Sequence, residues 1–198
     1  MSAVSTRIAI EAHELTREFA GGVRALDGVS FAVEEGEIFG YLGRNGAGKS
    51  TTVRILTTLL RPTSGTASVL GHDVGKDPAS VRKVFGCALQ EAALDELMTG
   101  REHLQMAGRL VGLPKAKASE RAAELLESFG LQAAADRIAA GYSGGMRRRL
   151  DVAMAMVRRP QVLFLDEPTT GLDPQARHQM WEKLRLLLRQ GKTILLTT

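Results

Sequence analysis

Residues 43–50, with the sequence GRNGAGKS, fit the pattern G-x-x-x-x-G-K-[ST] at every fixed position. This pattern is typical of a phosphate-binding loop that holds a nucleoside triphosphate together with magnesium. Glycines at 43, 46 and 48 have no Cβ and tolerate positive φ, so the backbone can wrap closely around an anion. Successive N–H groups then point into one concavity. We therefore assign Gly43, Gly46 and Gly48 to phosphate binding.

The residues that follow the glycines supply the charge and the hydroxyl groups. We expect Lys49 to neutralise the β and γ phosphates, Ser50 to offer its hydroxyl to the metal, and Thr51 to reach a phosphate oxygen. The positive end of the helix that begins near Gly48 favours the same anion. Asn45, in the same loop, is also assigned to the nucleotide.

The flanking segments decide whether the loop is more than a glycine turn without a ligand. Residues 37–42 have the pattern of a short apolar strand that enters the loop. Residues 51–60 have the pattern of a helix with one apolar face, and Pro62 is expected to end it. Strand, loop and helix in this order are the context that the motif requires.

Composition limits the remaining possibilities for this chain. With 198 residues, 44% of them apolar and 24% charged, it has an ordinary globular composition. The net charge of +4 does not indicate direct binding to nucleic acid. The arginine run 147–149 has no interleaved aromatic residues and is expected to be a solvated face of a helix rather than a nucleic-acid site. Cys87 lies in an apolar stretch and is expected to be a buried small residue rather than a reactive thiol, in a reducing cytosol. No apolar stretch is long enough to span a bilayer, so a membrane role needs a partner.

The order of patterns predicts one α/β domain with an inserted helical lobe. Strand patterns occur at 8–15, 29–33, 65–70 and 84–89, with a turn at 71–73, and they return at 162–165 and 193–196. Between about 92 and 159 the pattern is helical. Because the sequence stops within a strand pattern, we expect the domain to be incomplete at its carboxyl end.

Residues 162–167 combine four apolar residues with Asp166 and Glu167. Apolar residues without alternation suit a central parallel strand, and ligands bind at the carboxyl ends of such strands. We expect Asp166 to hold magnesium through water and Glu167 to polarise the attacking water as general base. A helix N-cap followed by an acidic first turn is the alternative.

Residues 142–146 form a second glycine turn ahead of a helix. Ser143 can cap that helix, while Gly144 and Gly145 allow close approach to an anion. An N-cap without a ligand explains the segment equally well. Asp173 before Pro174 has the pattern of another N-cap with proline in the first turn.

Taken together, these segments resemble the ATP-binding subunit of ABC transporters, in the expected order and over essentially the whole chain. The phosphate loop is followed by Gln90 at the Q-loop position, the signature at 142–146, the Walker B strand at 162–167 and the D-loop at 171–174. The resemblance implies a P-loop NTPase (RecA-like) core with an N-terminal antiparallel β subdomain and an inserted helical subdomain. Residues 1–91 and 160–198 then form the β subdomain and the ATP-binding core of a single nucleotide-binding domain. Residues 92–159 form its helical subdomain.

The resemblance also implies roles for individual residues. Glu167, Lys49 and Gln90 act in catalysis, and Gln90 joins Ser50 and Asp166 at the magnesium ion. Ser143, Gly144 and Gly145 of a second copy close over the γ-phosphate, and Asp173 acts across that homodimer. Phe19 is the candidate that stacks on adenine, with plain core packing as the alternative. The signature departs from the usual Leu-Ser-Gly-Gly-Gln at Tyr142 and Met146, and the position of the family's switch histidine falls at or beyond Thr198.

Residues 59–65, 94–102 and 142–149 look most like daunorubicin-resistance-type (ABC-2) exporters of bacteria. This resemblance implies an ATP-hydrolysing subunit, peripheral on the cytoplasmic face of the membrane, that powers export of a small molecule through a separate permease. The alternatives are a non-transport ABC ATPase or a regulatory one. The segment between Gln90 and Ser143 is too short for the long coiled coils of DNA-repair machines, and Glu167 argues against a module that does not hydrolyse ATP.

Overall fold

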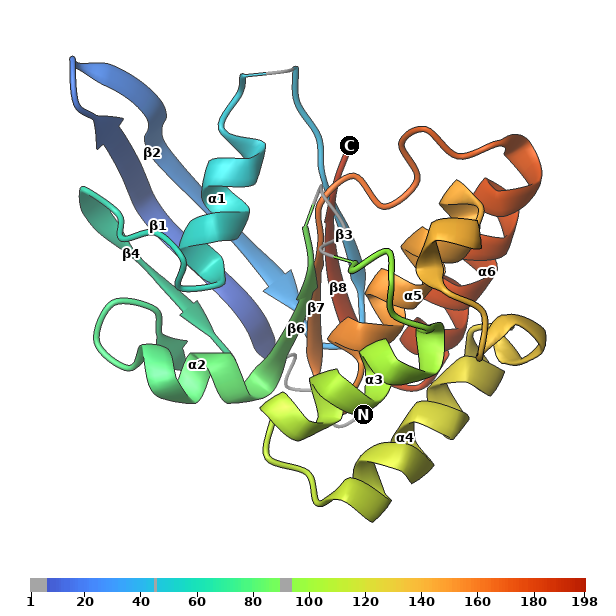
Figure 1. Ribbon diagram of the computed structural model, residues 1–198. Helices are drawn as coiled ribbons and strands as arrows, with labels where there is room; N and C mark the ends of the chain where they lie inside the picture. The colour runs from blue at the N-terminus through green and yellow to red at the C-terminus, as the bar shows by residue number, and fades with distance from the viewer. Residues whose placement is uncertain (1–6, 45, 90–93) are drawn as a thin grey trace, which may run out of the picture.

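The chain folds around two β-sheets that lie side by side (Figure 1). The computed structural model describes residues 7–44, 46–89 and 94–198. Asn45 and Gln90, both assigned to the nucleotide site from the sequence, therefore lie outside the described residues. The α/β architecture predicted from the sequence is confirmed.

The first sheet is antiparallel and has the strand order β2-β1-β4-β5. Its strands are β1 (Ile8–Phe19), β2 (Val23–Glu34), β4 (Ser64–Val69) and β5 (His72–Asp73). The first two are longer than the sequence pattern predicts, because β1 pairs with β2 up to Phe19↔Val23. The turn expected at 71–73 is centred on Leu70 and Gly71, both with positive φ, and His72 already pairs with Val69.

The second sheet is parallel and has the order β3-β8-β7-β6. It consists of β3 (Ile38–Tyr41), β8 (Thr193–Thr197), β7 (Val162–Leu165) and β6 (Phe85–Ala88). Every residue of β7 and β8 is buried. Since the strands are parallel, their carboxyl ends meet at one edge, where β3 leads into the phosphate loop and β7 into Asp166 and Glu167.

Helix α1 (Lys49–Leu56) follows the phosphate loop but is shorter than predicted. The expectation that it continues to residue 60 and ends at Pro62 is wrong. Thr58 adopts a left-handed φ of 62°, and the Leu59 N–H turns back to the Arg54 carbonyl oxygen at 2.8 Å. This closure ends the helix before the proline, and Leu59 is left 62% exposed.

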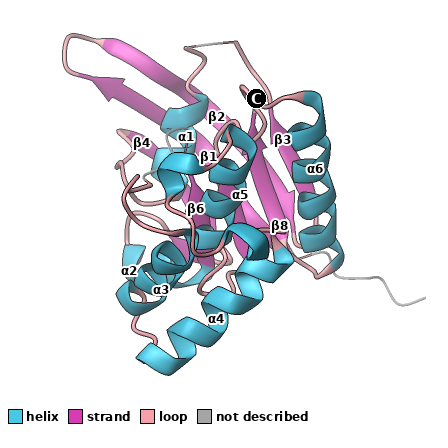
Figure 2. Cartoon of the chain, turned by 45° about the vertical axis from the view of Figure 1, so that its right-hand side comes forward, coloured by secondary structure: helices cyan, strands magenta, loops and turns pink. Residues whose placement is uncertain are grey.

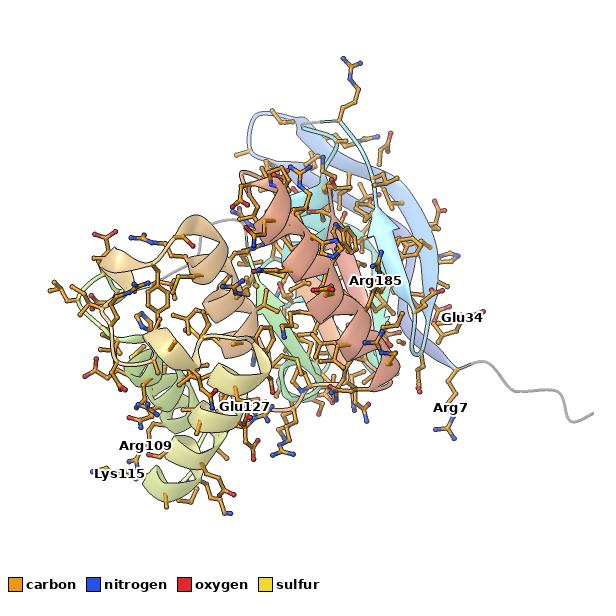
Figure 3. All side chains as sticks on the ribbon, turned by 90° about the vertical axis from the view of Figure 1, so that its right-hand side faces the viewer. Arg7, Glu34, Arg109, Lys115, Glu127 and Arg185 are labelled. Carbon is orange, nitrogen blue, oxygen red and sulfur yellow. The ribbon has the colours of Figure 1, made fainter. Side chains whose placement is uncertain are left out.

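In the sequence, the remaining α-helices precede β6, β7 or β8 of the parallel sheet. They are α2 (Pro78–Val84), which the sequence analysis missed, α3 (Gly100–Leu110), α4 (Lys115–Ser128), α5 (Gly144–Ala155) and α6 (Pro174–Arg189). Figure 2 shows α4 and α5 in front of the strands and α6 along one side. The charged side chains of Arg109, Lys115 and Glu127 point away from α3 and α4 (Figure 3). Within the described part of the chain, no helix has the length and apolarity needed to cross a bilayer.

The parallel sheet separates two hydrophobic cores. Val162 and Phe164 of β7 pack into the core shared with α1 and the antiparallel sheet. Leu163 and Leu165 pack on the other side, with α3 to α6. Both faces of the strand are thus covered, which explains why its sequence is a continuous apolar run.

Cys87 lies in β6 and is half-buried. Burial raises the pKa of its thiol to about 11, and the nearby carboxyl group of Asp151 adds to the increase. The thiol therefore stays protonated near neutral pH, as suits a packing residue rather than a nucleophile.

Candidate functional site

The phosphate loop connects β3 to α1, so the predicted order of strand, loop and helix is confirmed. Gly48 is the N-cap of α1 and has a φ of 84°. A Cβ at this position would lie 2.3 Å from the Ala25 carbonyl oxygen and 2.5 Å from the Leu26 Cδ2 atom. Glycine is thus required at position 48 for two reasons: the positive φ of the backbone and the close approach of β2.

The loop and the start of α1 border a cavity of about 380 Å³. It brings Lys49, Ser50 and Thr51 together with Glu167, which comes from the far end of the sequence. The full lining is Ala25, Arg44, Gly46, Gly48, Lys49, Ser50, Thr51 and Glu167. The first turn of α1 carries no acidic residue, so its positive end faces the cavity without compensation and suits an anion.

Lys49 is 8% exposed, and its ammonium group is held inside the loop. Nζ donates hydrogen bonds to the carbonyl oxygen of Gly43 and, at 3.3 Å, to that of Arg44. The positive charge is therefore fixed beside the N–H groups of the loop, where phosphate oxygens are expected.

Asp166 and Glu167 follow β7 directly at the carboxyl edge of the sheet. Asp166 is 4% exposed, and its backbone N–H donates to the Ala88 carbonyl oxygen at 2.9 Å. Glu167 has a left-handed φ of 48° and reaches the cavity of the phosphate loop. The alternative of a helix N-cap is wrong here, because the next helix, α6, begins at Pro174 and is capped by Asp173.

The second glycine turn lies outside the cavity of the phosphate loop. Ser143 caps α5, and its Oγ accepts the Met146 N–H at 3.3 Å. Gly144 borders a separate hollow of about 270 Å³, which Glu167 also lines. Ser143, Gly144 and Gly145 of one chain thus do not line the cavity that holds Lys49.

The departure from the usual signature at Tyr142 has a structural explanation. Its ring is 6% exposed, and its hydroxyl donates to the Ala134 carbonyl oxygen at 2.7 Å. Tyr142 therefore belongs to the core of the helical region. The N-cap predicted for Asp173 is confirmed, since its carboxylate accepts the N–H groups of Gln175 and Ala176, both at 3.0 Å.

Phe19 ends β1 and is 39% exposed. The guanidinium carbon of Arg17 lies 4.7 Å from the centre of its ring. The alternative that Phe19 is a plain core residue is wrong. Phe19 does not line the 380 Å³ cavity either, so its proposed contact with adenine is not seen within one chain.

The arginine run 147–149 is not the solvated face expected from the sequence. Arg148 is 8% exposed, pairs with Asp151 at 2.7 Å, and donates to the carbonyl oxygens of Leu89 and Asp166. Arg149 is half-buried and donates to Gln179 on α6. The run follows the start of α5, which packs between the sheet and α6, so two of its three side chains point inward.

The sequence analysis also missed the role of Thr197 at the site. Its side chain is fully buried at the end of β8, and its hydroxyl contacts both residues of the acid pair. A polar residue directly after the apolar run 194–196 was the available signal.

The residues at the site fit a magnesium ion. Among the described residues no group of three or more His, Cys, Asp or Glu side chains could hold a metal by itself. Magnesium retains several waters and combines one or two protein oxygens with the phosphates of its substrate. The Ser50 hydroxyl and the Asp166 carboxylate provide oxygens of this kind.

Comparison with known proteins agrees with this geometry. The family model described as ABC transporter matches residues 26–170, which include the phosphate loop, the second glycine turn and the acid pair. The chain belongs to the ABC transporter family. The ABC fold accounts for both sheets and for the helices between β6 and β7.

Relatives of this ABC chain include ATP-binding proteins that are named for drug resistance and for Nod factor export. The daunorubicin/doxorubicin resistance ATP-binding protein DrrA of Streptomyces peucetius is 54% identical over 96% of this chain. The Nod factor export ATP-binding protein I of Rhizobium sp. (strain N33) is 46% identical over 98%. The chain spans 57% of the length of the first relative and 63% of the second.

Two solved ABC structures have the same fold. The cbiO1 subunit from Clostridium perfringens, part of the transporter complex cbiONQ, superimposes with a TM-score of 0.87 at 27% identity, over 97% of this chain and 78% of its own. The ATP-binding cassette MJ0796, a dimer bound to ADP and Pi in a post-hydrolysis state, has a TM-score of 0.85 at 25% identity, over 96% and 87%.

Proposed function

We propose that this chain is the ATP-hydrolysing part of an exporter that moves a small molecule through a separate membrane permease. The observation that carries the proposal is the shared cavity, in which Glu167 faces Lys49, Ser50 and Thr51. A carboxylate and a phosphate-binding loop in one cavity are the parts that hydrolysis of a triphosphate needs.

Each part of the cavity has a role in holding ATP. Lys49 and the loop N–H groups bind the β and γ phosphates, together with Thr51 and the positive end of α1. Ser50 and Asp166, with Gln90 as a third candidate, hold magnesium. When bound, the metal neutralises phosphate charge and orients the γ-phosphate.

Glu167 is the general base in this proposal. Its carboxylate accepts a hydrogen bond from water and polarises it for attack on the γ-phosphorus. Lys49 stabilises the charge that develops on the transferring phosphoryl group. The buried position of Lys49 strengthens this interaction, because few waters screen it.

A second copy of the chain completes the site. Ser143, Gly144 and Gly145 lie outside the cavity of their own chain. Ser143 and Gly144 are exposed at the start of α5, whereas Gly145 is buried. In a head-to-tail homodimer they close over the γ-phosphate of the partner, Asp173 acts across the interface, and Phe19 stacks on adenine. The dimeric state of MJ0796 with ADP and Pi supports this arrangement.

The helical segment is the proposed contact with the permease. We divide the single nucleotide-binding domain into two parts. Residues 1–91 and 160–198 form the β subdomain with the ATP-binding core, and residues 92–159 form the helical subdomain. On the latter part Leu97 is 82% and Ile138 45% exposed, and they lie on adjacent segments joined by the bridge Thr99↔Ile138. Exposed apolar residues of this kind mark interaction sites, and here they suit an integral-membrane partner at the cytoplasmic face.

The names of the relatives favour export over the alternative of a non-transport or regulatory ABC ATPase. Nod factor export is a transport role, and resistance to daunorubicin and doxorubicin suits removal of the drug from the cell. The test uses the protein as its gene encodes it, expressed with the permease of the neighbouring gene. We expect Mg-dependent ATP hydrolysis and lower accumulation of daunorubicin in the cells. Hydrolysis without any effect of the permease would favour the non-transport alternative, and absence of hydrolysis would contradict the enzyme itself.

A further inference from the structure

Thr197 joins the two acidic residues of the site through one hydroxyl group. In the parallel pairing of β7 and β8, Leu165 lies opposite Leu196, so Thr197 is placed beside Asp166. The Glu167 N–H donates to the Thr197 Oγ1 at 3.0 Å, and the same hydroxyl donates to the Asp166 Oδ1 atom. The Thr197 side chain is fully buried, so water does not compete for these bonds.

These two bonds use both capacities of the hydroxyl, as donor and as acceptor. The bond to Asp166 occupies one carboxylate oxygen and fixes the orientation of that group. The bond from Glu167 holds its peptide N–H, and the φ of 48° at this residue is unusual for a residue with a side chain. Without this bond, the partly buried N–H of Glu167 would lack the partner that stabilises the left-handed conformation.

We propose that Thr197 is a positioning residue that sets the orientation of Glu167, through its backbone, and of Asp166, through its carboxylate. It does not touch substrate. The inference rests on the proposed ATPase function and deepens it, because it assigns the placement of the general base to a strand far away in the sequence.

A role in packing alone is the competing explanation. Threonine is β-branched and suits a buried strand, but valine has nearly the same shape and would fill the same space. The chain provides a matched control in Thr193, at the opposite end of β8. Thr193 is 2% exposed, and its hydroxyl accepts the Gly36 N–H at 2.9 Å, at the edge of the sheet away from the acid pair.

The experiment compares wild type, T197V, T197S and T193V in the full protein. It measures kcat and KM for ATP, the melting temperature, and ATP-dependent dimer formation by size-exclusion chromatography. We expect T197V to lower kcat about 10- to 100-fold, as small misplacements of reacting groups do, with KM changed less than about threefold. T197S should recover most of kcat. T193V should lose a similar amount of thermal stability but keep kcat, and T197V alone should accumulate the ATP-bound dimer.

The double variant E167Q/T197V tests the proposed route. If Thr197 acts through Glu167, adding T197V to E167Q should cost little further activity, because the group that it positions is already lost. Should T197V fold poorly, T197C, with a weak hydrogen-bonding group of similar size, takes its place. Wild-type kcat in T197V, or an equal loss of kcat in T197V and T193V, would overturn the inference. Additive losses of kcat in the double variant would overturn the route through Glu167. Absence of hydrolysis by wild type would overturn the proposed function instead, and with it this inference.

Discussion

The guanidinium group of Arg148 donates a hydrogen bond to the backbone carbonyl oxygen of Asp166. The same side chain donates to the Leu89 carbonyl oxygen at 2.7 Å, directly before the segment that contains Gln90. Helix α5, which starts at the second glycine turn, is thereby tied to the carboxyl ends of both β6 and β7. The sequence pattern had assigned this arginine to a solvated face.

Loss of Arg148 should destabilise the fold strongly. Arg148→Met leaves Asp151 as a buried carboxyl group without its partner, and such a change costs about 3–5 kcal/mol. The measurement is the free energy of unfolding in urea at pH 7. Arg101→Met is the control, because the Arg101–Asp136 pair is exposed and should contribute at most about 1 kcal/mol. Similar losses in the two variants would contradict the structural role of Arg148.

Asp151 should make stability depend on pH. Burial raises the pKa of this carboxyl group from 3.8 to about 6, although Arg148 opposes the increase. Between these values the folded state binds more protons than the unfolded state, so the free energy of unfolding falls as pH rises. We expect a loss on the order of 2–3 kcal/mol between pH 4 and pH 6 in wild type relative to Asp151→Asn. A constant difference between the two proteins across this range would show that folding does not raise the pKa of Asp151.

Glu167→Gln should separate ATP binding from hydrolysis. The amide keeps the shape of the side chain but cannot act as a base, so kcat should fall by at least about 100-fold. ATP should remain bound, and the protein should accumulate as a dimer in size-exclusion chromatography with ATP. Glu127→Gln, on the exposed face of α4 (Figure 3), is the control and should behave as wild type. An unchanged hydrolysis rate in Glu167→Gln would exclude Glu167 as the base.

Lys49→Ala should weaken nucleotide binding. The variant removes charge-assisted hydrogen bonds to phosphate, each worth about 1.5–3 kcal/mol, so the dissociation constant for ATP should rise at least about tenfold. Isothermal titration calorimetry provides the measurement. Lys183→Ala, on α6 and away from this cavity, should bind ATP as wild type does. Full affinity in Lys49→Ala would contradict the assignment of the loop.

Gly48→Ala should be more harmful than Gly21→Ala. Both glycines have a φ near 85°, so both substitutions introduce a similar backbone strain of about 1–2 kcal/mol. Only the Cβ at position 48 also meets another segment, since a Cβ at position 21 has no neighbour within 4 Å. The additional clash should cost a further 1–3 kcal/mol or so in the free energy of unfolding. Equal losses would mean that the loop can move away from Ala25.

The parts of the site that could be predicted are those encoded by neighbouring residues. The phosphate loop, the acid pair after β7 and the caps at Ser143 and Asp173 depend on local spacing and on local hydrogen bonds. Their positions follow from short patterns, because the chain needs only a few residues to build each of them.

The parts that could not be predicted depend on contacts between distant segments. The place of Thr197 beside Asp166 follows from the register of two strands, and the burial of Arg148 follows from the packing of α5 against the sheet. The early end of α1 depends on the left-handed turn at Thr58, and a threonine in the sequence does not predict this conformation.

The alternation of β7 between two cores has a mechanical consequence. Phe164 faces the side of the phosphate loop and Leu163 the side of the helices, so a sideways displacement of the strand compresses one core while it opens the other. Close-packed interiors resist both changes. A shift of β7 at its nucleotide end is therefore expected to move α5 as well, because Leu163 and Leu165 pack in the core that contains Leu150 and Val152 of that helix.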